Sequence, residues 1–226
     1  MNQGMLYALA AYTAWGFLPI FWKSLRALPA GELLGQRVVW SLLFMGVFLT
    51  FKRDWRPVAA AVRTRRTLLA TLVATALLSG NWLIYIWGVN AGHILEASLG
   101  YFINPLVNVL LGVVFLRERL RLSQWLPIGL AFLGVLYLAF DYGRLPWISL
   151  ALAFSFGLYG LIKKTVRLSS AHGFTLEIGL MFLPALAYLL YLEALGQGAF
   201  GHASLSTTLL IILTGVVTVF PMVWFG

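Results

Sequence analysis

The sequence contains no cysteine, which excludes disulfide bonds, cysteine-ligated metals and thiol chemistry. Charge is also scarce: charged residues make up 10% of the chain, whereas a soluble domain carries about 25%. Hydrophobic residues make up 61%, more than a soluble fold of 226 residues can bury. These deficits exclude a soluble globular protein and indicate that lipid is the solvent for much of the chain.

Common enzyme signatures are missing as well. The chain lacks the GxxxxGK[ST] phosphate loop, the HExxH motif and the GxSxG motif, so the usual bases for an ATPase motor, a zinc hydrolase and a serine hydrolase are absent. The three histidines, His93, His172 and His202, lie far apart in the sequence. We therefore expect no metal site and no cofactor.

Eight apolar runs of membrane-crossing length occupy most of the sequence. A helix needs roughly 20 apolar residues to cross a hydrocarbon core about 30 Å thick. The runs lack the strict polar–apolar alternation that is typical of a β-barrel. The sequence therefore predicts an all-α polytopic membrane protein with transmembrane helices near residues 4–22, 31–51, 67–90, 95–116, 122–140, 146–162, 173–193 and 206–226.

The 16 Lys and Arg residues lie mainly between these runs, and the basic stretch 52–66 forms the one real linker. With a cytoplasmic amino terminus, most of them face the cytoplasm, as the positive-inside rule requires. A net charge of +9 distributed in this way indicates topology rather than nucleic-acid binding. We predict a multi-pass protein of the cell inner (plasma) membrane. The cytoplasmic residues are Lys52, Arg53, Arg56, Arg63, Arg65, Arg66, Arg117, Arg119, Arg121, Lys163, Lys164 and Arg167; Lys23, Arg26 and Arg144 lie outside.

The chain resembles itself weakly when displaced by 141 positions, because Lys23 then aligns with Lys164 and Arg26 with Arg167. Chance similarity between hydrophobic segments is the alternative. Repeats of five helices, an odd number, have opposite orientations, as in secondary transporters that bind substrate near the membrane midplane. We predict a first five-helix repeat at 1–141 and an incomplete second repeat of three helices at 142–226. A ten-helix inverted repeat is the expected whole, so we expect a truncated chain or an incomplete gene model.

Several stretches carry a resemblance to a known family. They are 11–16 (AYTAWG), 81–93 (NWLIYIWGVNAGH), 95–108 (LEASLGYFINPLVN) and 117–120 (RERL). They resemble the EamA-type drug/metabolite transporters, specifically the RarD branch, whose members are often called chloramphenicol-sensitive proteins or permeases. The resemblance covers essentially the whole chain. It implies ten helices in two inverted repeats and a permease for small metabolites or drugs in the bacterial inner membrane.

Polar residues within the apolar runs are the candidates for substrate binding, because a polar side chain is costly in lipid and usually faces protein or water. In the run 95–116, Glu96, Gly100, Asn104 and Asn108 recur every four residues and share one helix face. This stripe either packs against a neighbouring helix or lines a cavity. Tyr101 lies beside it.

Two other runs add candidates near mid-depth. Asn81 and Tyr85 share a face of the run 67–90, where a structural amide bond and a substrate contact are both possible. Trp15 either packs within the bundle or stacks on an apolar ligand. The predicted substrate-binding residues are Trp15, Asn81, Tyr85, Tyr101, Asn104 and Asn108.

Five ionisable residues fall near the outer ends of the first four runs, and they are Lys23, Glu32, Arg37, His93 and Glu96. They are candidates for a gate that opens outward, and Glu96 or His93 for a coupling proton. In the alternative, Lys23 extends its ammonium group toward the membrane surface, and Glu32 forms a static pair with Arg37.

The sequence therefore predicts a secondary transporter that moves a small, partly apolar organic molecule by alternating access and performs no chemistry on it. Proton antiport and uniport-type exchange both agree with the sequence. The alternatives are an intramembrane enzyme that uses Glu96 and His93, and a non-transporting membrane subunit. The small-residue pairs Gly31–Gly35 and Gly88–Gly92 allow a homodimer.

Overall fold

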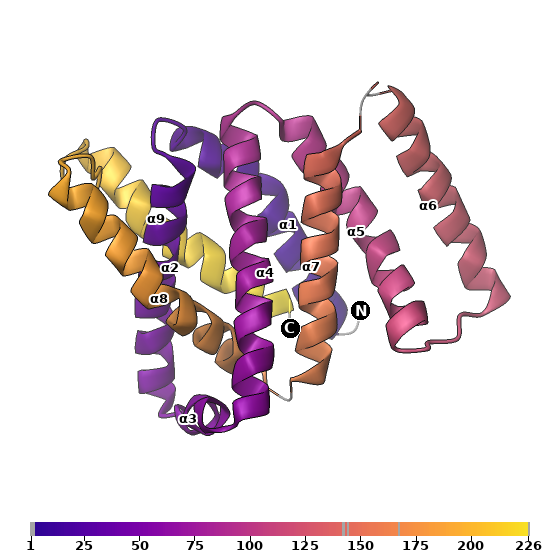
Figure 1. The fold of residues 1–226 in the computed structure, drawn as a ribbon, viewed down its shortest axis with the longest axis horizontal. Coiled ribbons are helices and arrows are strands. Elements are labelled where there is room, and N and C mark those ends of the chain that lie inside the picture. The colour runs from indigo at the N-terminus through magenta and orange to yellow at the C-terminus, as the bar shows by residue number, and fades with distance from the viewer. Residues whose placement is uncertain (1–2, 142, 144, 167, 226) are drawn as a thin grey trace. The chain divides into compact units, whose positions relative to one another are not determined.

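The computed structural model describes residues 3–141, 143, 145–166 and 168–225, in which nine helices and no strand are found. The eight long helices agree with the eight predicted runs to within a few residues, so the predicted all-α polytopic membrane fold is confirmed. Their order is drawn in Figure 1. The bounds are α1 (Gln3–Ser24), α2 (Ala30–Lys52), α3 (Arg56–Arg63), α4 (Arg65–Asn90), α5 (Ile94–Phe115), α6 (Leu122–Asp141), α7 (Trp147–Thr165), α8 (Ser170–Ala194) and α9 (Leu205–Phe225).

Six of the described helices are long and apolar enough to cross a membrane, namely α2, α4, α5, α6, α8 and α9. The two remaining long helices, α1 and α7, have 22 and 19 residues. Because a helix rises about 1.5 Å per residue, all eight have lengths in the range that a hydrocarbon core requires.

The short helix α3 lies in the stretch that we expected to be a linker, so the prediction missed a helix there. Pro57 stands in its first turn, where a missing N–H costs nothing, and three alanines follow. Val58 and Ala61 share one face of α3 and are buried with Leu49 of α2 and Leu176 of α8. Packing on this cluster fixes α3 against the ends of two longer helices.

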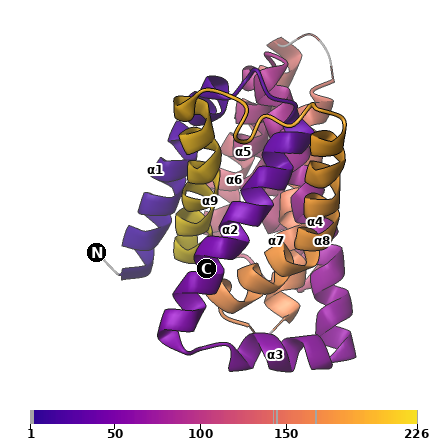
Figure 2. The same cartoon turned by 90° about the vertical axis from the view of Figure 1, so that its left-hand side faces the viewer.

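The described chain forms two compact units, each of which has its own packing. Unit 1 comprises Met1–Thr75 and Val166–Gly226, and therefore α1, α2, α3, α8, α9 and the start of α4. Within it, α2 contacts both α8 and α9, and α9 also contacts α1 (Figure 2).

Glycines bring the helices of unit 1 close together. A Cβ on Gly31 would lie 3.0 Å from the Tyr188 hydroxyl, and one on Gly35 would lie 3.0 Å from Leu189, both on α8. The predicted small-residue pair Gly31–Gly35 therefore packs within the chain itself. A homodimer stays a prediction.

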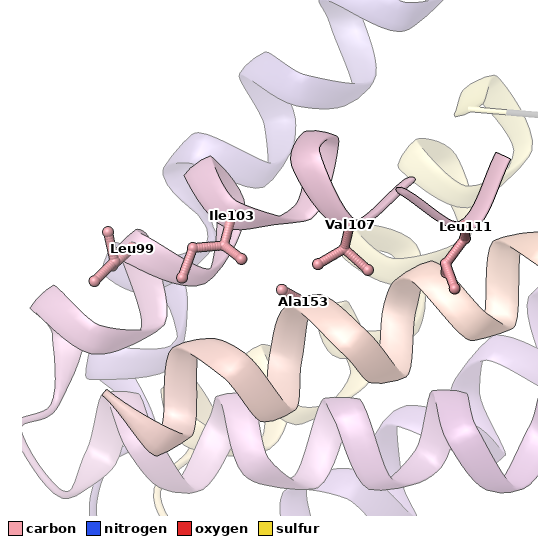
Figure 3. Packing of buried hydrophobic residues seen from close by; sticks show 5 residues of the cluster. All are labelled: Leu99, Ile103, Val107, Leu111 and Ala153. Carbon is pink, nitrogen blue, oxygen red and sulfur yellow. The ribbon is translucent and has the colours of Figure 1, made fainter. Parts of the chain in front are cut away.

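Unit 2 comprises Ala76–Thr165 and is built on the contact between α5 and α7. Four residues of α5 that recur every four positions form one buried cluster with Ala153 of α7 (Figure 3). Gly157 permits this approach, since a Cβ there would lie only 2.8 Å from Val107. No residue of α6 is buried, and its apolar side chains suit a lipid environment. The α5 residues are Leu99, Ile103, Val107 and Leu111.

Gly215→Ala should destabilise unit 1. The new Cβ would lie 2.6 Å from the backbone carbonyl carbon of Trp40 and 2.7 Å from its Cβ, so α9 must move away from α2. Overpacking of this kind costs about 1–3 kcal/mol. We expect a lower midpoint of thermal unfolding in detergent. Gly179→Ala is the control, because no atom lies within 4 Å of its added Cβ; equal midpoints for the two variants would contradict the packing of α2 on α9.

Candidate functional site

Asn81 of α4 forms structural hydrogen bonds within unit 2. Its Nδ2 donates to the backbone carbonyl of Leu152 at 2.9 Å and to Oγ of Ser155 at 2.8 Å, both on α7. The Ser155 hydroxyl in turn donates to the carbonyl of Ala151 at 2.6 Å. Of the two roles predicted for Asn81, the structure shows the structural hydrogen bond, through which the Asn81 amide joins α4 to α7.

Two tyrosines meet beside this bond. The rings of Tyr85 on α4 and Tyr101 on α5 are 6.0 Å apart and nearly perpendicular, at 86°. This edge-to-face arrangement is favourable for aromatic pairs. Tyr85 is buried, whereas Tyr101 is 42% exposed. Of the two rings, that of Tyr101 is the accessible one.

The predicted polar stripe of α5 packs on α7 at several points. A Cβ on Gly100 would lie 3.2 Å from the backbone oxygen of Ser149 and 3.2 Å from Cβ of Leu152. Asn108 is exposed, but its Oδ1 lies 3.4 Å from the position that a Cβ on Gly157 would take. At these two positions the stripe serves helix packing, which was one of its two predicted roles.

Asn104 differs from its neighbours on the stripe. It lies at the middle of α5 and is 8% exposed, yet its Oδ1 has no hydrogen-bond partner among the described groups. A buried acceptor left unsatisfied costs about 1–3 kcal/mol. This amide is therefore available to a ligand or a water molecule. Gly100, one turn away on the same face, contacts the Leu152 that Asn81 also contacts.

These residues form what we call the polar cluster of unit 2, in which α4, α5 and α7 each place polar groups among apolar side chains. Asn81 and Ser155 hold the helices together, Oδ1 of Asn104 has no hydrogen-bond partner among the described groups, and the two tyrosines pack edge to face. Ser155 was missed by the sequence analysis. Its signal in the sequence was one of two serines, Ser149 and Ser155, within the largely apolar run 146–162. The members are Asn81, Tyr85, Tyr101, Asn104 and Ser155.

His93 and Glu96 come together at the start of α5. The His93 Nδ1 atom lies 3.2 Å from Oε1 of Glu96, whose side chain is 3% exposed. The ring of Trp87 stacks on His93 at 5.7 Å, and the Ser149 hydroxyl donates to the backbone carbonyl of Glu96 at 2.6 Å. A histidine against a buried carboxylate is an arrangement that can hold a proton.

The other predicted gate residues lie in unit 1, and two of them, Glu32 and Arg37, have partners that the sequence did not indicate. Oε1 of Glu32 accepts a hydrogen bond from the backbone N–H of Ala199 at 2.7 Å. The described contacts of Glu32 do not include Arg37, so the static pair between them is not observed. Nε of Arg37 donates to the Thr218 hydroxyl at 2.6 Å, and its guanidinium lies 5.3 Å from the centre of the Trp22 ring.

The five predicted gate residues are thus divided between the units, three in unit 1 and two in unit 2. Lys23 is exposed and forms no ion pair with a described residue. The side chain of Trp15 lies outside the described residues. No group of three or more metal-ligating side chains is found in the part of the chain that the structure describes.

Comparison with known proteins gives the family. A model of the EamA-like transporter family matches residues 2–140. The RarD protein of Streptomyces exfoliatus is 48% identical over 225 residues, which are 100% of this chain and 71% of that protein. RarD of Salmonella typhi is 45% identical over 227 residues, which cover 99% of this chain and 76% of that protein. The uncharacterized transporter YojE of Bacillus subtilis is 44% identical over 228 residues, which cover 100% of this chain and 76% of that protein. No solved structure matches the chain.

Identities of 44–48% along the whole chain, together with a family match over more than half of it, agree with the resemblance in 81–120. They also agree with the apolar helices of the fold. The chain is therefore a membrane transporter that belongs to the EamA-like transporter family, in its RarD branch.

Proposed function

We propose that this chain is a secondary transporter of the inner membrane that moves a small, partly apolar organic molecule by alternating access. The observation that carries the proposal is the unsatisfied Oδ1 of Asn104 at the middle of α5, beside the pair Tyr85–Tyr101. Side chains of this kind can hold a ligand without reacting with it. The two inverted repeats expected at 1–141 and 142–226 belong to this proposal, and the family match over 2–140 supports the first of them.

Coupling to protons is a second part of the proposal. His93 and Glu96 are the candidates, because a carboxylate that is 3% exposed lies 3.2 Å from an imidazole nitrogen. A proton shared between these groups changes the charge of a buried site, and so changes the balance between conformations. Uniport-type exchange is the alternative. An enzyme built on the same pair would alter its substrate, which a transporter does not.

The polar cluster of unit 2 predicts opposite effects for its two asparagines. Asn104→Ala removes an unsatisfied acceptor, so stability should be retained while flux falls about tenfold through loss of one hydrogen bond to the substrate. Asn81→Ala removes two structural bonds and should lower stability by about 1–3 kcal/mol. The measurements are thermal unfolding and flux of a metabolite mixture into proteoliposomes, quantified by mass spectrometry.

Wild-type flux of every compound through Asn104→Ala would contradict the assignment of the binding site. Compounds that cross with unchanged mass exclude the enzyme. If no compound crosses through the wild type under any gradient, the transporter proposal itself fails.

Glu96→Gln keeps the shape of the side chain but removes its charge. If Glu96 carries the coupling proton, a pH gradient should accelerate flux through the wild type but leave flux through this variant unchanged. The measurement is initial flux with and without a gradient in the same vesicles. Glu118→Gln is the matched control, because that carboxylate is exposed and pairs with Lys164 at 3.3 Å. An equal response of wild type and Glu96→Gln would remove Glu96 from the coupling step.

The absence of native cysteine gives a direct test of the proposed orientation. With the amino terminus in the cytoplasm, Gln197→Cys in the loop before α9 faces outside and Thr64→Cys at the end of α3 faces inside. A membrane-impermeant maleimide added to intact cells should label the first variant and reach the second only after permeabilisation. Labelling in the reverse order would show the opposite orientation.

A further inference from the structure

Six basic residues gather around α3, and we call them the α3 basic surface. All six are exposed, and they occupy a stretch that runs from the last residue of α2 to the first turn of α4. α3 lies across the end of α2 in unit 1 (Figure 2). The surface therefore lies between the carboxyl end of α2 and the amino end of α4, two helices that are long and apolar enough to cross a membrane. Its residues are Lys52, Arg53, Arg56, Arg63, Arg65 and Arg66.

The protein does not neutralise this surface itself. None of the six cations forms an ion pair with a described residue; Lys52 instead lies 5.7 Å from the centre of the Phe48 ring. Asp54 is the only acid in the stretch, and its Oδ2 is held at 3.0 Å by Nε2 of His172 on α8. Cations this close in sequence repel one another, so an external anion stabilises them.

The apolar face of α3 is already occupied. Val58 and Ala61 are buried against Leu49 and Leu176, so α3 cannot insert this face into lipid as a surface-bound amphipathic helix does. Docking on α2 and α8 instead holds the arginines of α3 facing outward. Beside them, Trp55 is 40% exposed and Phe51 86% exposed, and aromatic rings at this position favour the headgroup layer.

We propose that the α3 basic surface is a binding site for anionic phospholipids, with the headgroup phosphate held by Arg56 and Arg63. Arginine binds phosphate through two parallel hydrogen bonds, and basic side chains near a membrane end attract anionic headgroups. The chemistry favours a lipid phosphate over a soluble one, because α2 and α4 are long and apolar enough to cross a membrane and the exposed rings of Phe51 and Trp55 lie beside the arginines. The site is independent of any transported substrate.

The test measures binding of a fluorescent short-chain phosphatidylglycerol to the full chain in uncharged detergent micelles. Phosphatidylcholine with the same chains serves as the uncharged comparison. We expect preferential binding of phosphatidylglycerol that weakens as salt is raised. Arg56→Gln combined with Arg63→Gln should weaken it roughly twenty-fivefold, since each basic side chain contributes about fivefold.

Arg117→Gln combined with Arg119→Gln is the matched control, because it removes the same charge from another basic loop; its binding should stay within about twofold of wild type. Equal weakening by both double variants would mean that only net charge matters and would overturn the proposal. Displacement of the lipid by an equal concentration of glycerol phosphate would also overturn it. If the α3 double variant does not fold, lipid binding by the wild type alone tests the proposal. Equal binding of the two lipids, or phosphatidylglycerol binding that does not change with salt, refutes the site.

Discussion

The fold is governed by the cost of a polar group that has neither water nor a partner. In hydrocarbon this cost forces backbone groups into helices and directs polar side chains toward one another. Asn81 meets the requirement through α7, Arg37 through a hydroxyl of α9, and Glu32 through a backbone N–H of Ala199. Several buried atoms have no hydrogen-bond partner among the described groups, and they include both amide atoms of Asn90, Oε2 of Glu32 and Oδ1 of Asn104. Asn104 lies at the middle of a helix that is long and apolar enough to cross a membrane, which is the depth at which the proposed ligand would bind.

Close helix packing in both units depends on residues without side chains. Gly35 and Gly215 allow α8 and α9 to approach α2, and Gly157 allows α5 to approach α7. Lipid provides no hydrophobic driving force between helices, so van der Waals contact over short distances must replace it. At Gly100 and Gly157 the close approach of α5 and α7 fills the space beside the polar stripe of α5.

Most of the fold could be predicted from the sequence because membrane crossing leaves a strong signal of length and hydropathy. All eight long helices were found, whereas α3 was missed because eight residues with two arginines and a proline resemble a linker. Partners were harder to predict. One of the two interpretations left open by the sequence was a static pair of Glu32 with Arg37, whereas in the structure Glu32 accepts a hydrogen bond from Ala199, which lies 167 positions away. Hydrophobic periodicity reports which face of a helix is buried and not which residue from a distant helix meets it.

The contacts of His172 with Asp54 and Ser169 have a consequence for how unit 1 is joined. Nδ1 of the ring lies 2.6 Å from the Ser169 hydroxyl, and Nε2 lies 3.0 Å from the Asp54 carboxylate. The ring therefore connects two segments that lie 118 positions apart in the chain. The turn that leaves α2 is anchored on the first turn of α8, so a displacement of either helix end must displace the other.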